Sequence, residues 1–278
     1  MASRALVLGG GGITGIAWEL GVLAGLAEAG VTLGEADLVV GTSAGSVVGA
    51  QLAGGIDVEE LYAAQLAGSG GEVRAEISKW TMAKWGWAVL RSRDPRKARA
   101  RIGRMALSAN TVPEAERRAV IESRLPVRSW PERRLLITAV DATSGEFATF
   151  DRESGVAVLD AVAASCAVPG VWPPVSINGR RWIDGGMRSP ANCDLAADCG
   201  QVVILAPMTD GFGPAASVAG QAAALRKSSR VAVVAPDEET RRAIGRSPLD
   251  PARRAPAARA GRAQAPAAAA SVAQTWSA

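Results

Sequence analysis

The sequence of 278 residues contains no histidine at all. Without an imidazole the chain has no Ser-His-Asp or Cys-His catalytic group, no HExxH zinc site and no histidine metal ligand. Proton transfer near neutral pH must then use a carboxylate, a lysine, a tyrosine or an ordered water. The absence excludes the histidine-dependent hydrolases and every histidine metal site.

Cysteine and long apolar runs are also scarce. Cys166, Cys193 and Cys199 are odd in number and lack CxxC spacing, so they support neither a disulfide framework nor a four-cysteine zinc site. The apolar stretch at residues 5–8 is too short for the core of a signal peptide, and no window approaches the ~18 to 20 apolar residues of a membrane span. We expect a reduced, cytoplasmic protein without a metal or an organic cofactor.

Strand and helix patterns alternate within the first 55 residues. Residues 5–8 and 38–40 have the pattern of short buried strands, and residues 13–29 and 43–54 have that of helices. This order predicts a three-layer α/β/α fold around a mostly parallel sheet. Further strands are expected at residues 135–140, 147–150, 175–183, 202–205 and 231–234, the third of these being a hairpin turned by an Asn-Gly pair.

Two segments depart from this alternation. Between about residues 69 and 125 the strand signals vanish, which predicts a helical insertion or lid within a domain of residues 1–250. Residues 251–278 hold 13 alanines and four arginines but no acidic residue. We expect this C-terminal tail to be a frayed surface helix or a disordered segment.

The insertion concentrates positive charge and tryptophan. Residues 79–104 hold nine basic residues against Asp94 alone, a local excess of +8. Such a stripe indicates contact with an anionic surface, either nucleic acid or membrane, or else a solvated helix face. The segment also contains Trp80, Met82, Trp85 and Trp87. These side chains are expected to line an acyl tunnel, to enter a lipid interface or to form plain core.

A glycine-rich loop joins the first strand to the first helix. Residues 10–15 read GGGITG and satisfy the G-x-G-x-x-G pattern of dinucleotide-binding folds. That interpretation needs an acidic residue at the carboxyl end of the second strand, but Asp37 precedes this strand. A P-loop is excluded because no Lys-Ser or Lys-Thr pair closes the glycine run. Dinucleotide binding is therefore disfavoured.

A candidate nucleophile follows the second strand. Residues 41–45 read GTSAG, the G-x-S-x-G pattern, between a strand and a helix. The sharp turn presents the Ser43 hydroxyl at a helix N-terminus, where unpaired amides and the helix dipole favour negative charge. The alternative is a serine that merely caps the helix on a glycine turn.

A serine nucleophile needs a base, and an aspartate is the natural substitute for histidine. Residues 184–186 read DGG and follow the hairpin, so the Asp184 carboxylate lies at a strand end on a tight turn. The alternative is an Asp-Gly turn without chemical consequence. Cys166 is a weaker candidate, because no imidazole is present to activate it, and a small buried hydrophobe is the better interpretation.

Together, the glycine loop, the serine elbow, the DGG turn and the stretch at residues 165–174 resemble the patatin-like phospholipase family over about residues 4–235. The resemblance implies an α/β acyl hydrolase with Ser43 as nucleophile and Asp184 as general base. It implies an oxyanion hole formed by the amides of Gly10, Gly11 and Gly12, with Gly15, Gly41, Gly45, Gly185 and Gly186 as further motif glycines. One departure is Thr14, where the family commonly has Arg or Lys.

The sequence therefore predicts a serine acyl-ester hydrolase that acts on lipid esters, of phospholipase A, lysophospholipase or lipid esterase type. Its expected partners are the lipid substrate and an anionic membrane surface, without nucleic acid. Two alternatives remain open: a non-catalytic lipid-binding relative and a nucleotide-binding oxidoreductase.

Overall fold

The computed structural model describes residues 3–67, 75–211 and 216–277 of the chain. These residues form one eight-stranded sheet of order β5-β6-β3-β2-β1-β7-β8, with β4 also paired to β3. Strands β3, β2, β1, β7 and β8 run parallel, whereas β4 and β6 are antiparallel to β3. The strands are β1 (Arg4–Leu8), β2 (Leu38–Gly41), β3 (Arg134–Asp141), β4 (Phe147–Phe150), β5 (Val175–Ile177), β6 (Arg180–Asp184), β7 (Gln201–Leu205) and β8 (Arg230–Val234).

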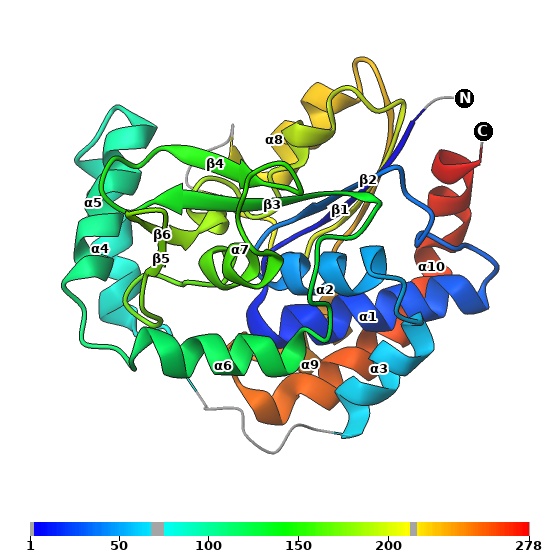
Figure 1. Ribbon diagram of the computed structural model, residues 1–278. Helices are drawn as coiled ribbons and strands as arrows, with labels where there is room; N and C mark the ends of the chain where they lie inside the picture. The colour runs from blue at the N-terminus through cyan, green and yellow to red at the C-terminus, as the bar shows by residue number, and fades with distance from the viewer. Residues whose placement is uncertain (1–2, 68–74, 212–215, 278) are drawn as a thin grey trace.

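Helices cover both faces of this sheet (Figure 1). Helices α1, α2 and α10 pack on one face, and α8 packs on the other, which confirms the predicted three-layer α/β/α class. The helices are α1 (Gly12–Glu28), α2 (Ala44–Ala53), α3 (Val58–Ala67), α4 (Lys79–Leu90), α5 (Pro95–Leu107), α6 (Glu114–Arg124), α7 (Val158–Ser165), α8 (Val218–Leu225), α9 (Glu238–Ile244) and α10 (Arg254–Trp276).

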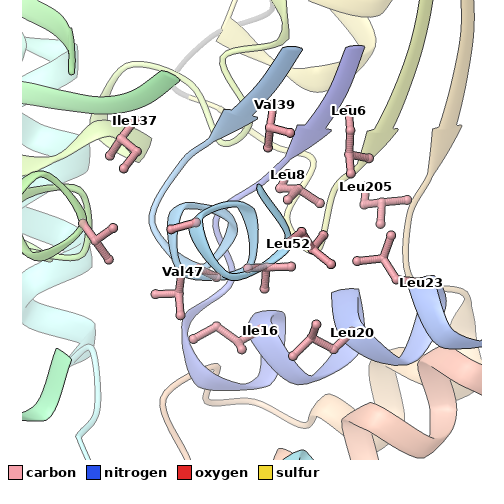
Figure 2. Packing of buried hydrophobic residues seen from close by; sticks show 14 of the residues in the cluster. Leu6, Leu8, Ile16, Leu20, Leu23, Val39, Val47, Leu52, Ile137 and Leu205 are labelled. Carbon is pink, nitrogen blue, oxygen red and sulfur yellow. The ribbon is translucent and has the colours of Figure 1, made fainter. Parts of the chain in front are cut away.

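The central strands are apolar on both faces because each face is covered. On β1, Leu6 and Leu8 belong to the core beneath α1 and α2, whereas Ala5 and Val7 belong to the core beneath α8. This is the period-2 alternation of a strand with two buried faces. Figure 2 shows the first of these cores, in which strand and helix side chains meet: Leu6, Leu8, Val39 and Leu205 with Ile16, Leu20, Leu23, Val47 and Leu52.

The predicted insertion is helical, as expected. It consists of α4, α5 and α6, while its predicted start at residue 69 lies outside the described residues. Helix α5 begins where the sequence supplies a cap, because the Asp94 side chain accepts hydrogen bonds from the amides of Arg96 and Lys97 and proline occupies the first turn. Figure 1 places α4 and α5 beside the antiparallel end of the sheet.

The C-terminal tail is a helix, as one of the two alternatives predicted, but it is neither frayed nor disordered. Residues 254–276 form α10, which lies along α1 (Figure 1) and buries Trp276 in the main core. The two helices approach so closely that a Cβ on Gly21 would lie 2.1 Å from the carbonyl oxygen of Ala258. The small alanine side chains allow the two helices to pack closely. The alanine-rich composition alone did not predict this packing. None of the helices in the described ranges combines the length and apolar character needed to cross a bilayer.

Candidate active site

Ser43 lies on a strained turn between β2 and α2. Its backbone has φ 52° and ψ −115°, a conformation that side-chain-bearing residues rarely adopt and that marks functional sites. The turn needs its glycines, because a Cβ on Gly45 would lie 2.1 Å from the carbonyl oxygen of Leu8. The Ser43 side chain makes no capping hydrogen bond to α2, so the simple helix-cap interpretation is wrong.

The structure brings Ser43 and Asp184 together from positions 141 residues apart. The Ser43 hydroxyl donates a hydrogen bond of 2.7 Å to Oδ2 of Asp184. The other carboxylate oxygen accepts a 2.7 Å hydrogen bond from the Gly186 amide. The DGG turn therefore orients the carboxylate toward the serine, which is the contact that a general base requires.

The environment of Asp184 changes its proton affinity. The side chain is 3% exposed, and burial raises its pKa from the ordinary 3.8 to about 6, although hydrogen bonds from Ser43 and Gly186 oppose the shift. A carboxylate with its pKa near neutrality is a stronger base than an exposed one and is still ionised at pH 7. Desolvation thus compensates in part for the missing imidazole.

The glycine loop lies beside Ser43 but its amides are not equivalent. The Gly10 amide donates to the carbonyl oxygen of Pro190 at 2.7 Å, so it is already engaged. This corrects the expectation that Gly10 contributes to an oxyanion hole. The amides of Gly11 and Gly12 have no hydrogen-bond partner within the described ranges, and Gly12 lines the pocket that contains Ser43.

The same loop is closed to a dinucleotide. The Thr14 amide donates to the carbonyl oxygen of Pro248 at 3.1 Å, and a Cβ on Gly12 would lie 2.6 Å from that oxygen. Asp37 lies at the amino end of its strand, where its carboxylate accepts a 2.8 Å hydrogen bond from the Arg4 amide. Neither the space nor the acidic partner of a dinucleotide site is present among these residues.

Two residues at the end of α7 support the serine elbow from behind. The Ser43 amide donates to Oγ of Ser165 at 2.9 Å, and Sγ of Cys166 donates to the Ser43 carbonyl oxygen at 3.3 Å. Burial raises the pKa of the Cys166 thiol to about 11, so it stays protonated and does not act as a nucleophile. This role of Ser165 was not predicted from the sequence. There Ser165 was noted only as part of the stretch at residues 165–174 that precedes the DGG turn.

A buried polar network extends from the elbow to the DGG turn. The Asn192 side-chain amide donates to Oγ1 of Thr42 at 3.0 Å and to the carbonyl oxygen of Gly185 at 3.3 Å. Thr138 on β3 donates to the same Thr42 hydroxyl at 3.0 Å. Because these groups are buried and paired, they fix the two catalytic turns relative to each other. No sequence motif indicated Asn192 or Thr138.

The space around Ser43 has two parts. A small pocket of about 30 Å³ contains the serine, which is enough for roughly one water molecule. Beside it lies a groove of about 1110 Å³ between α1, α2, α3 and α6. Ile13, Ile16 and Arg124 line both, so the groove adjoins the nucleophile. Ile16 and Val47, which form part of its wall, lie close together in Figure 2.

The four apolar side chains singled out on α4 divide between core and surface. Trp85 is buried, whereas Trp80 is 79% exposed, Met82 59% and Trp87 56%. None of the four lines the pocket of Ser43 or the adjoining groove, so these two spaces do not support the acyl-tunnel interpretation; Trp85 and Trp87 instead line a separate cavity of about 530 Å³. Leu90, at the end of the same helix, is 88% exposed.

The chain is similar to proteins of known structure and to one protein family. The chain is similar in fold to the crystal structure of VipD from Legionella pneumophila, with 15% identity, a TM-score of 0.48, and coverage of 98% of this chain and 67% of that one. The chain is also similar to the type III effector protein ExoU, with 17% identity and a TM-score of 0.43. That match covers 99% of this chain and 53% of the ExoU chain, so this chain spans about half of its length. The family model for patatin-like phospholipase matches residues 6–197, which include the glycine loop, the serine elbow and the DGG turn. The chain therefore belongs to the patatin-like phospholipase family.

Proposed function

We propose that the protein hydrolyses the acyl esters of lipids through a Ser43–Asp184 dyad. The observation that carries this proposal is the 2.7 Å hydrogen bond between the Ser43 hydroxyl and a buried carboxylate. It occurs on a strained elbow beside unengaged loop amides, which is the arrangement of a nucleophile, a base and an oxyanion site. Membership of the patatin-like phospholipase family supports the lipid substrate.

The reaction follows from the positions of these groups. Ser43 Oγ attacks the ester carbonyl carbon while its proton passes to Asp184, and the carbonyl oxygen becomes an oxyanion. The amides of Gly11 and Gly12 donate to this oxyanion, and each such donor contributes roughly 3 to 4 kcal/mol to transition-state stabilisation. Collapse of the intermediate releases the alcohol, which takes the proton from Asp184. Water, deprotonated by Asp184, then hydrolyses the acyl-enzyme and restores Ser43.

The adjoining groove suits an acyl chain. Its apolar wall includes Ile16, Val47, Ile56 and Leu61, and its volume of about 1110 Å³ slightly exceeds the ~300 to 1,000 Å³ that is usual for ligand pockets. A chain bound there has its carbonyl end at the Ser43 pocket, because the two spaces share Ile13 and Ile16. The groove thus supports a long-chain ester as the substrate.

The exposed face of α4 supports docking to an anionic membrane surface. Trp80, Trp87 and Leu90 project from it, and Lys79, Lys84, Arg93 and Arg104 are exposed around them. Tryptophans enter the lipid interface while the cations meet the headgroups. Arg96 and Arg99 contribute less, because Arg96 pairs with Glu146 at 2.8 Å and Arg99 donates to the Gly145 carbonyl at 2.9 Å. A cytoplasmic location remains a prediction.

Labelling with a fluorophosphonate followed by peptide mapping tests the nucleophile. We expect one adduct on Ser43, and we expect Ser43→Ala to lose both labelling and ester turnover while the fold survives. Ser271→Ala, which changes an exposed serine of α10 outside the pocket and the groove, is the matched control and should label like the wild type. An adduct on Ser165 would contradict the assignment, and a wild type that neither labels nor hydrolyses any ester would favour a non-catalytic lipid-binding relative.

A further inference from the structure

Two arginines of the insertion lie beside the nucleophile. Arg117 and Arg124 both line the small pocket that contains Ser43. They are seven residues apart on α6, so two helical turns place them on the same side of that helix. Burial raises the pKa of the Cys166 thiol, and the positive charges of both arginines act in the opposite direction. Since Cys166 contacts the Ser43 carbonyl, the two guanidinium groups lie near the elbow itself.

Neighbouring groups hold the Arg117 side chain and the end of α6 in place before any substrate binds. Arg117 is buried, and its guanidinium carbon lies 3.8 Å from the centroid of the Trp172 ring. The Gln51 side chain on α2 donates a 2.7 Å hydrogen bond to the carbonyl oxygen of Arg124, which fixes the end of α6 against α2. Ile121, between the two arginines, is fully buried and anchors the helix. When the side chains of a site already lie in their binding positions, ordering them costs less entropy as the ligand binds.

We propose that Arg117 and Arg124 bind the phosphate of a glycerophospholipid next to the scissile ester and so select phosphate-bearing esters over neutral glycerides. The proposal rests on the proposed function, since it concerns the substrate of the same Ser43 site. A guanidinium group offers a planar fork of donors that matches phosphate oxygens, and charge-assisted hydrogen bonds of this kind are stronger than neutral ones.

The arrangement of the pocket fits the order of groups in such a lipid. The acyl chain occupies the groove beyond Ile13 and Ile16, and the carbonyl lies in the small pocket at Ser43. The phosphate, for which that pocket has no room, lies at its mouth against Arg117 and Arg124. Arg124 lines both the pocket and the groove, so it stands where the two parts of the substrate diverge. A neutral glyceride offers nothing to these two charges.

The test compares two esters that differ in the phosphate headgroup. Dihexanoyl phosphatidylcholine and dihexanoylglycerol carry the same short acyl chains and are used as dissolved monomers, so that docking to a lipid surface plays no part. Arg117→Gln and Arg124→Gln should each lower kcat/KM for the phospholipid roughly 10- to 100-fold, the loss expected of a charge-assisted hydrogen bond. Turnover of dihexanoylglycerol, which also reports that each variant is folded, should stay within about twofold.

Three further measurements sharpen the result. Arg118→Gln is the matched control, because Arg118 is on the same helix but pairs with Asp160 at 2.9 Å outside the pocket; both esters should be unaffected. Arg117→Lys and Arg124→Lys keep the charge and should keep part of the preference for phosphate. Inhibition of dihexanoylglycerol hydrolysis by inorganic phosphate, lost in Arg117→Gln, would show that free phosphate also fills the site; no inhibition, together with the expected losses on the phospholipid, would assign the site to the lipid alone.

Equal losses on both esters in the Gln and Lys variants would overturn the proposal and make the arginines structural. An unchanged ratio between the esters in every variant would overturn it too, while the dyad stands. A wild type that hydrolyses neither ester would instead overturn the proposed function on which it rests.

Discussion

The two sides of the active site are built in different ways. Ser43 and Asp184 lie at the ends of strands β2 and β6, and buried hydrogen bonds connect their turns through Thr42 and Asn192. The other side is α6, which brings Arg117 and Arg124 to the pocket; beyond it lie α4, with exposed tryptophans, and α5, with many cations. The chemistry thus depends on a rigid, paired interior, whereas contact with lipid depends on side chains that face the pocket or the solvent. Changes on the dyad side should affect every ester, and changes on the insertion side only some.

The largest expected effect on the dyad side, after removal of the nucleophile, is that of Asp184→Asn. Loss of the general base should lower kcat roughly 10²- to 10⁴-fold for soluble and lipid esters alike, with little change in KM. Steady-state kinetics on one soluble ester and one phospholipid check this. A near wild-type kcat in this variant would mean that another group accepts the serine proton.

Ser165→Ala should have a smaller effect of the same kind. Removal of Oγ leaves the Ser43 amide without its buried acceptor, so we expect kcat to fall about tenfold on all esters, with a loss of about 1 to 3 kcal/mol in unfolding free energy. Kinetics and urea unfolding measure the two losses. Unchanged values of both would show that the strained elbow does not need this support.

The raised pKa of Asp184 should lower the free energy of unfolding at neutral pH. Its pKa is about 6 in the folded state against an ordinary 3.8, so the folded protein binds more protons than the unfolded chain between about pH 4 and pH 6. The stability of the wild type should therefore decline as the pH rises through this range, by up to about 3 kcal/mol from this group. Asp184→Asn should lack the decline and be at least as stable as the wild type at pH 7.5. Urea unfolding at several pH values measures this, and a variant less stable at pH 7.5 would contradict it.

The smallest effect on catalysis itself should come from the outer face of α4. Replacement of Trp80, Trp87 and Leu90 by serine should lower binding to anionic vesicles and turnover of vesicle lipid, with soluble esters within about twofold. Binding of the wild type should weaken with salt, because exposed charges are screened beyond ~8 to 10 Å at physiological ionic strength. Met208→Ser removes another exposed apolar side chain and serves as the control in vesicle co-sedimentation. Equal losses on soluble and vesicle substrates would make α4 a structural element.

Much of the dyad side could be predicted from the sequence, because short patterns determine its local geometry. The GTSAG elbow and the DGG turn combine strand ends with glycines, and such turns admit few conformations. The strands followed from apolar patterns, and the Asn-Gly pair marked the hairpin, where both residues have positive φ. The local sequence was enough to predict a turn or a strand where its own backbone geometry decided the structure.

The rest depended on contacts between distant segments. Nothing local indicates that the Gly10 amide is taken by Pro190, or that Arg117 and Arg124 face Ser43 from an insertion. The packing of α10 against α1 was missed for the same reason, since alanine-rich composition is equally typical of disorder and of a tightly packed helix. Tertiary contacts, which have no signature in the pattern of one segment, decide these features.

The pH dependence of fluorophosphonate labelling tests the central claim, the Ser43–Asp184 dyad, most directly. We expect a mapped adduct on Ser43 whose rate of formation rises from about pH 5 to about pH 7, with a midpoint near the pKa of about 6 for Asp184, and a slow rate without this rise in Asp184→Asn. A labelling rate that does not change across this range in the wild type, or an adduct on any other residue, would contradict it.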